Sequence, residues 1–176
     1  MTKKALVLVL LLGTAFSLSV VAGAGQGSGV RSGLVRFEGG IGVIPVSSGQ
    51  GTAATATVVN RNIVRGVPPA GQPWVIERLS VDVKIDGQIS VDGRGLLLGG
   101  GNNIGRSNLA MVRARLFCGP VATQTTHDSG LVELDAAGDF RIEDVLNLLP
   151  PDPCDTPTLL IVNSAGSWFA AGIPKE

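Results

Sequence analysis

The clearest pattern along the chain is a strict alternation of apolar and polar residues from Leu79 to Ile85. Successive side chains of an extended strand point to opposite sides, so this stretch has one aliphatic face and one polar face. The next dipeptide, Asp86-Gly87, tolerates the positive φ angles of a tight turn, and the alternation resumes in Ile89-Ser90-Val91. We therefore predict an antiparallel hairpin here, with a second turn at Asp92-Gly93.

Shorter apolar or alternating stretches, separated nearly everywhere by Gly and Pro, indicate further strands. No sustained helical period appears, and only residues 142–149 could form a short helix, or equally a corner between strands. The pattern predicts an all-β fold, an antiparallel β-sandwich of immunoglobulin-like or similar Greek-key order with at most one short helix. The further strands are expected at 35–38, 41–46, 52–59, 109–118, 131–135, 140–142, 158–162 and 168–171.

The C-terminal part of the chain supports the same fold class. It runs from Leu131 through Gly138-Asp139-Phe140 and Cys154 to the segment 168–173. In style it resembles the closing strands of many extracellular immunoglobulin-like sandwiches, over about a quarter of the chain. The resemblance implies a sandwich, and it carries no motif specific to one family.

The N-terminal residues have the pattern of a secretion signal. Lys3 and Lys4 precede an apolar run over 5–21, and Ala22-Gly23-Ala24 supplies the small residues that a signal peptidase accepts. We predict a signal peptide over 1–24, cleaved after Ala24, which would make the protein secreted or periplasmic. An uncleaved membrane anchor is the alternative, because the run approaches the length of a spanning helix.

After cleavage, the chain is expected to comprise two parts. Residues 25–33 are Gly- and Ser-rich and predict a flexible lead-in, and residues 34–176 predict a single β-sandwich domain. The signal contains two of the 14 basic residues and no acid, so 12 basic and 14 acidic residues remain. This balance, without basic clusters, predicts neither nucleic-acid binding nor membrane insertion after cleavage.

Two cysteines, Cys118 and Cys154, are the only ones in the chain. An even count in an exported protein favours a disulfide. Cys118 also shares the alternating face of Val112, Ala114 and Leu116, opposite two arginines, so it is expected to point into the core.

Candidate catalytic groups are few. The single histidine lies in His127-Asp128-Ser129, and neighbours in sequence usually point in different directions, so we interpret this segment as a polar strand ending in a turn. One histidine and a cysteine pair cannot supply a zinc or copper site. Carboxylates at expected turns leave calcium binding or glycoside hydrolysis as alternatives, but no calcium-loop motif occurs and we predict neither metal nor cofactor. These carboxylates are Asp86, Asp92, Asp135, Asp139, Glu143, Asp144, Asp152 and Asp155.

A glycine- and asparagine-rich stretch is the candidate recognition loop. It lacks the Lys-Ser/Thr ending of a phosphate-binding loop and reads first as a long hairpin connection, but exposed tips of this composition often carry recognition. Trp74 and Trp168 are expected to pack in the core or at its rim. The candidate loop residues are Gly99, Gly100, Gly101, Asn102 and Asn103.

These observations favour an exported, non-catalytic module with a binding or assembly role at the cell envelope or outside the cell. Its partner would be an extracytoplasmic protein or a glycan. Two alternatives stay open: a small secreted hydrolase that uses carboxylates or His127, and a structural scaffold that pairs through exposed strand edges.

Overall fold

The computed structural model describes residues 32–48 and 59–175, and over these residues it contains thirteen strands and no helix. The predicted all-β, antiparallel fold is confirmed. No helix long and apolar enough to span a membrane occurs within the described ranges. The strands are β1 (Gly33–Gly42), β2 (Val46–Ser48), β3 (Val59–Arg61), β4 (Trp74–Val75), β5 (Arg78–Lys84), β6 (Gln88–Arg94), β7 (Leu97–Leu98), β8 (Met111–Cys118), β9 (Thr125–Asp128), β10 (Val132–Glu133), β11 (Phe140–Val145), β12 (Thr158–Asn163) and β13 (Trp168–Lys175).

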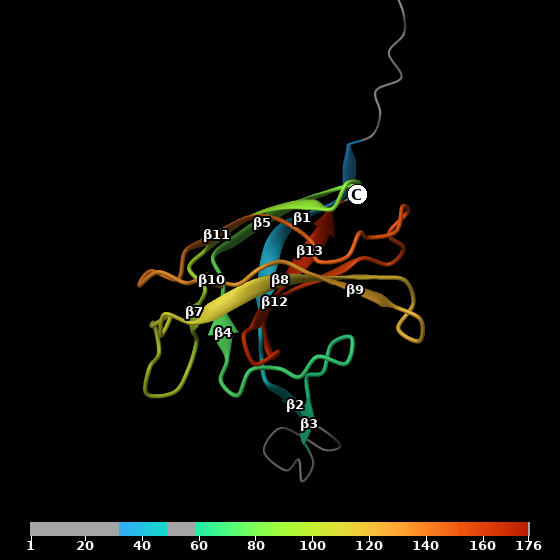
Figure 1. The fold of residues 1–176 in the computed structure, drawn as a ribbon. Helices are drawn as coiled ribbons and strands as arrows, with labels where there is room; N and C mark the ends of the chain where they lie inside the picture. The colour runs from blue at the N-terminus through green and yellow to red at the C-terminus, as the bar shows by residue number, and fades with distance from the viewer. Residues whose placement is uncertain (1–31, 49–58, 176) are drawn as a thin grey trace, which may run out of the picture. The chain divides into compact units, whose positions relative to one another are not determined.

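Nine of these strands form one curled sheet, a half-barrel, in the order β10-β8-β12-β13-β1-β5-β6-β11, with β9 also paired to β8. The two ends of this order approach each other. The Asn147 N–H donates to the Asp128 carbonyl over 2.9 Å, and the Gly130 N–H donates to the Asp144 carboxylate over 2.6 Å. Figure 1 shows the result: β5 and β11 lie above β8 and β12, while the separate β2–β3 hairpin projects away from the sheet.

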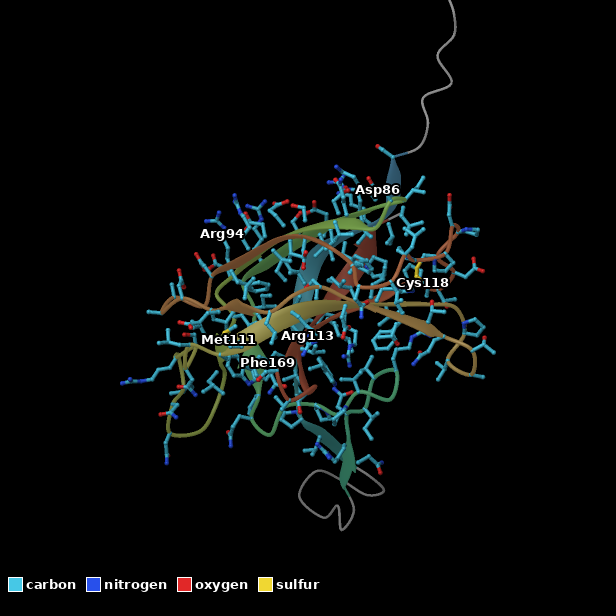
Figure 2. All side chains as sticks on the ribbon, viewed as in Figure 1. Asp86, Arg94, Met111, Arg113, Cys118 and Phe169 are labelled. Atoms are coloured by element: carbon cyan, nitrogen blue, oxygen red, sulfur yellow. A yellow bond between two sulfur atoms is a disulfide. The ribbon has the colours of Figure 1, made fainter. Side chains whose placement is uncertain are left out.

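The predicted hairpin between β5 and β6 is confirmed. Leu79, Val81 and Val83 are buried along β5, in register with Gly93, Val91 and Ile89 of β6. At the turn, Gly87 has φ 83°, and the Gln88 N–H donates to the Asp86 carboxylate over 3.1 Å. Asp86 and Arg94 mark the two ends of this hairpin arm in Figure 2.

The expected second turn at Asp92-Gly93 is wrong. Both residues lie inside β6, where Gly93 pairs with Leu79 on one side and with Phe140 on the other. The Phe140 ring occupies the space where a Cβ of residue 93 would stand. The glycine therefore serves close packing of an aromatic ring and does not reverse the chain.

Residues 142–149 form the corner that was the alternative to a helix. β11 continues to Val145, and the chain then bends with Leu146 buried and its N–H donating to the Gly87 carbonyl over 2.9 Å. The helical alternative is wrong here. Residues 140–145 of β11 form backbone hydrogen bonds with β6, and a helical turn could not form these bonds.

Some predictions fall outside the described residues. They are the signal peptide over 1–24, most of the lead-in over 25–33, and most of the strand expected at 52–59. Within the described part, β1 already begins at Gly33.

Strand β12 is buried on both of its faces. Leu159, Leu160, Ile161 and Val162 are all 0% exposed, although alternate residues of a strand point to opposite sides. Residues 62–70, called the covering segment below, contribute to the same core, since Val67 and Ala70 belong to one buried cluster with these four residues. The Trp168 N–H donates to the carbonyl of Pro68 over 2.9 Å, and the Ala70 N–H donates to the carbonyl of Trp168 over 3.0 Å.

Arg65 fastens this covering segment to the sheet. Its guanidinium donates to the Thr158 hydroxyl over 3.0 Å and to the carbonyls of Gly119 and Thr156 over 2.8 and 2.5 Å. The Gln124 amide in turn donates to the Arg65 carbonyl over 3.0 Å. All these acceptors are neutral, so the arginine acts as a multiple hydrogen-bond donor in a structural role.

The predicted disulfide between Cys118 and Cys154 is present, with its Cα atoms 4.9 Å apart. Cys118 is 1% exposed, as its place on the apolar face of β8 requires. The yellow sulfur bond in Figure 2 joins the end of β8 to the segment that precedes β12. It thereby closes the chain segment that contains β9, β10 and β11.

Replacing both cysteines with alanine should lower the free energy of unfolding by roughly 3 to 4 kcal/mol, because the unfolded chain gains the entropy of an open loop. Urea unfolding of the purified protein measures this loss. The wild-type protein unfolded in reducing agent should reproduce the variant, and equal stability of the oxidised and reduced proteins would contradict the expectation.

Gly93→Ala should cost about 1 to 3 kcal/mol of unfolding free energy, because the new methyl group would overlap the Phe140 ring. Gly33→Ala is the matched control. No atom lies within 4 Å of a Cβ at that position, so its stability should stay near that of the wild type. Equal urea midpoints for the two variants would show that the Phe140 contact does not constrain residue 93.

Candidate functional site

A cleft of about 480 Å³ lies where the loop after β7 meets β4 and the start of β13. Its volume lies in the range typical of small-ligand sites. One part of its lining is apolar and comprises Ala70, Trp74, Leu98 and Phe169. The other part carries side-chain amides and a hydroxyl, from Gln72, Asn102, Asn103, Asn108, Asn163 and Ser167. We call it the amide cleft.

The apolar wall is built around two stacked rings. Trp74 and Phe169 have centroids 4.0 Å apart and planes inclined by 13°. The Trp74 backbone N–H donates to the Val43 carbonyl over 3.0 Å, which fixes β4 against the end of β1. Trp74 is 6% exposed, so it packs as the sequence predicted, with its edge at the cleft.

Trp168, the other tryptophan, is also packed. Its indole N–H donates to the Asn62 carbonyl over 2.9 Å, which ties β13 to the covering segment. The indole N–H of Trp74, by contrast, has no acceptor among the described residues.

The candidate recognition loop forms one side of the amide cleft. Gly100 to Asn103 line it, whereas Gly99 lies beneath and donates its N–H to the Pro73 carbonyl over 2.8 Å. Two hydrogen bonds close the base of the loop: Leu98 N–H to the Arg106 carbonyl over 2.9 Å, and Gly105 N–H to the Leu98 carbonyl over 2.8 Å. Its shape is thus set by backbone bonds as well as by composition.

Gly101 allows the loop to lie against Gln72. It has φ 78°, and a Cβ there would stand 2.7 Å from the Gln72 Oε1 atom. Only glycine combines that backbone conformation with that approach. The amides of Gln72, Asn102 and Asn103 are thereby brought to one side of the cleft.

The opposite side comes from two turns that the sequence analysis did not single out. Asn108 and Leu109 have φ 52° and 50°, an unusual conformation for leucine, and Asn108 lines the cleft. Asn163 accepts a hydrogen bond from the Ser167 N–H over 2.8 Å, which shapes the turn between β12 and β13. Asn108 follows the loop closely in sequence, but Asn163 lies in the separate turn between β12 and β13, so no local pattern joined Asn163 to the loop.

The amide cleft carries no formal charge. None of its lining residues is Asp, Glu, Lys, Arg or His. The amides of Gln72, Asn102, Asn103 and Asn108 make no hydrogen bond to any residue that the structure describes, and neither do the backbone N–H groups of residues 100–103. The cleft thus offers unused donors and acceptors beside an apolar wall.

His127, Asp128 and Ser129 do not form a catalytic set. The His127 ring is 2% exposed, with Nδ1 2.9 Å from the Leu148 carbonyl and Nε2 2.8 Å from the Thr125 hydroxyl. Ser129 Oγ lies 3.0 Å from the Ala114 N–H, from which it accepts a hydrogen bond. Each side chain holds a different part of β9 in place, as the polar-strand interpretation expected.

Asp128 is the anion of a paired charge cluster. It accepts two hydrogen bonds of 2.7 Å from the Arg115 guanidinium, and Arg113 lies 3.7 Å away. The hydrogen bonds that Arg115 donates to Asp128 raise the pKa of Arg115 above its ordinary value. This cluster joins β8 to β9 and does not line the amide cleft.

The carboxylates predicted at turns fall in several places, of which one hollow is lined by Asp92, Asp135 and Asp139 and another by Glu143 and Asp144. Asp92 accepts hydrogen bonds from Arg94 and Arg141, which hold the pKa of Asp92 below its ordinary value. Asp135 and Asp139 cap backbone N–H groups of their own turn and of Gly95. Over the described ranges, no group of three or more His, Cys, Asp or Glu residues is arranged to hold a metal ion.

In comparisons with protein-family models, curated protein sequences and solved structures, nothing matches this chain.

Proposed function

We propose that this protein is an exported, non-catalytic binding module that takes an uncharged polar ligand in the amide cleft. One observation carries the proposal: side-chain amides from four separate segments converge on a single cleft with hydrogen-bonding capacity that the described protein does not use. Unused polar groups beside an apolar wall are the usual composition of a ligand site.

The lining supports binding rather than catalysis. It supplies donors and acceptors but no ionisable side chain that could act as general acid or base. The hydrolase alternative would need His127 or a pair of carboxylates at a shared cleft. His127 is enclosed and bonded at both ring nitrogens. Asp92, Asp135 and Asp139 do line one hollow, but there Asp92 is paired with Arg94 and Arg141, and the other two accept backbone N–H bonds.

The scaffold alternative needs free strand edges in the main sheet. The edges of β9 and β11 face each other, and the bonds from Asn147 and Gly130 bridge them. This arrangement favours ligand binding over strand addition.

Export and a sandwich-like build are parts of the same proposal. The signal pattern over 1–24 and the Cys118–Cys154 disulfide both suit an oxidising compartment. The burial of all four residues Leu159 to Val162 of β12 would suit a strand inside a sandwich. An immunoglobulin-like Greek key stays a prediction, since the strand order is that of one curled sheet.

Intact mass spectrometry of the protein recovered from the extracytoplasmic fraction of its own source tests export. The expected mass is that of residues 25–176 less the two hydrogens lost in forming the disulfide. A mass that retains residues 1–24 would instead favour the uncleaved membrane anchor.

Asn102→Ala combined with Asn103→Ala should weaken ligand binding at the amide cleft by about tenfold or more. Each lost hydrogen bond contributes about 1 kcal/mol, and 1.4 kcal/mol corresponds to a factor of ten. The measurement is two-dimensional amide NMR of the exported chain with a mixed panel of neutral oligosaccharides and uncharged peptides. Shifts should concentrate at residues 70–74, 100–103 and 163–169.

The matched control is Gln88→Ala, which removes an exposed amide on β6 outside the cleft and should leave binding unchanged. Shifts that persist in the double asparagine variant would place the ligand elsewhere. Conversion of any panel compound would contradict a non-catalytic role.

A further inference from the structure

We propose that the ligand of the amide cleft is an uncharged glycan. This inference rests on the proposed function and adds the chemical class of the ligand. It follows from the charge of the lining, from the kind of polar groups it presents, and from the strand edges that border it.

The lining selects against charged ligands. A buried charge is costly unless an opposite charge meets it, and the cleft offers only amides, one hydroxyl and backbone groups. Arg106, the charged residue next to the recognition loop, lines a different hollow, with Leu109 and Ala136. Acidic sugars, phosphorylated ligands and ionised peptides would therefore lose solvation without gaining a partner.

The polar groups suit hydroxyls. A carboxamide presents an acceptor oxygen and two N–H donors side by side, and a sugar hydroxyl both donates and accepts. Four such carboxamides without described partners line the cleft, on Gln72, Asn102, Asn103 and Asn108. Neighbouring hydroxyls of a sugar ring would thus find both kinds of partner within one side chain.

The apolar wall suits the other surface of a sugar. A pyranose ring has C–H groups on its face and hydroxyls around its rim, so it suits a site with apolar and polar contacts side by side. Trp74, Phe169, Ala70 and Leu98 are each 5 or 6% exposed, so small parts of their side chains reach the cleft and supply the apolar contact. The indole N–H of Trp74, which has no acceptor among the described residues, adds a donor.

A peptide would lack its usual mode of binding here. Extended peptides bind mainly by adding a strand to a free sheet edge. At the cleft, β4 pairs with β7, the Trp74 N–H is bonded to Val43, and the Leu98 N–H is bonded to Arg106. Both bordering strands therefore have neighbours on each side, which leaves side-chain recognition as the mode that the cleft supports.

Isothermal titration calorimetry of the exported chain distinguishes the ligand classes. The probes are cellohexaose, xylohexaose, mannohexaose, maltohexaose and chitohexaose, with hexagalacturonate as the charged sugar and hexapeptides of Gly, Ser and Asn with blocked ends as uncharged peptides. We expect at least one neutral hexasaccharide to bind, and hexagalacturonate and the peptides to bind at least about tenfold more weakly.

Two variants locate the binding. Gln72→Ala combined with Asn102→Ala should weaken the neutral sugar by about tenfold or more, and Gln88→Ala should not. Trp74→Phe keeps a ring on Phe169 but removes the indole N–H, so it should weaken the sugar several-fold while far-ultraviolet circular dichroism confirms the fold. A sugar affinity insensitive to all cleft variants would overturn both the glycan assignment and the proposed function.

The remaining outcomes separate the two proposals. Tight binding of a peptide or of hexagalacturonate that the Gln72 and Asn102 substitutions abolish would overturn the glycan assignment and leave the proposed binding function standing. If no neutral sugar bound and a peptide bound in a way that the cleft substitutions abolish, the glycan assignment would again fail and the binding function would stand. Absence of binding by the whole panel would overturn both.

Discussion

Covering both faces of β12 is the constraint on which the rest of the structure depends. A run of four apolar residues, Leu159 to Val162, leaves no face of this strand suited to water. The curled sheet and the covering segment both contribute to its burial, since Val67 and Ala70 share one buried cluster with these residues. Arg65, Ala70 and Trp168 hold that segment in place through hydrogen bonds to neutral acceptors.

The covering segment also positions the amide cleft. The chain continues from Ala70 directly to Gln72 and Trp74. The covering segment therefore positions one amide and one of the two stacked rings of the cleft. The recognition loop then rests against this backbone through Gly99 and Gly101. The proposed binding site is therefore built on the rigid part of the fold, which lowers the entropy lost on binding.

Charge is segregated from the cleft. The part-buried pair of Asp128 with Arg115 joins β9 to β8, and Asp92 pairs both with Arg94 of its own strand and with Arg141 of β11. The pairs that cross between strands favour the observed neighbours and register. The neutral lining of the cleft leaves hydrogen bonding and apolar contact as the sources of affinity, which is the basis for the glycan proposal.

The sequence by itself determined the local features of this protein. Alternation specified β5 and β6, Asp86-Gly87 specified their turn, and two cysteines specified the disulfide, because each depends on neighbouring residues or on a count. Composition also singled out the loop at 99–103.

Tertiary structure decided the other features. Gly93 is in a strand because the Phe140 ring lies over it, and Asn163 joins the loop at one cleft because the curled sheet brings distant turns together. Such convergence is a property of strand order, which no local pattern encodes.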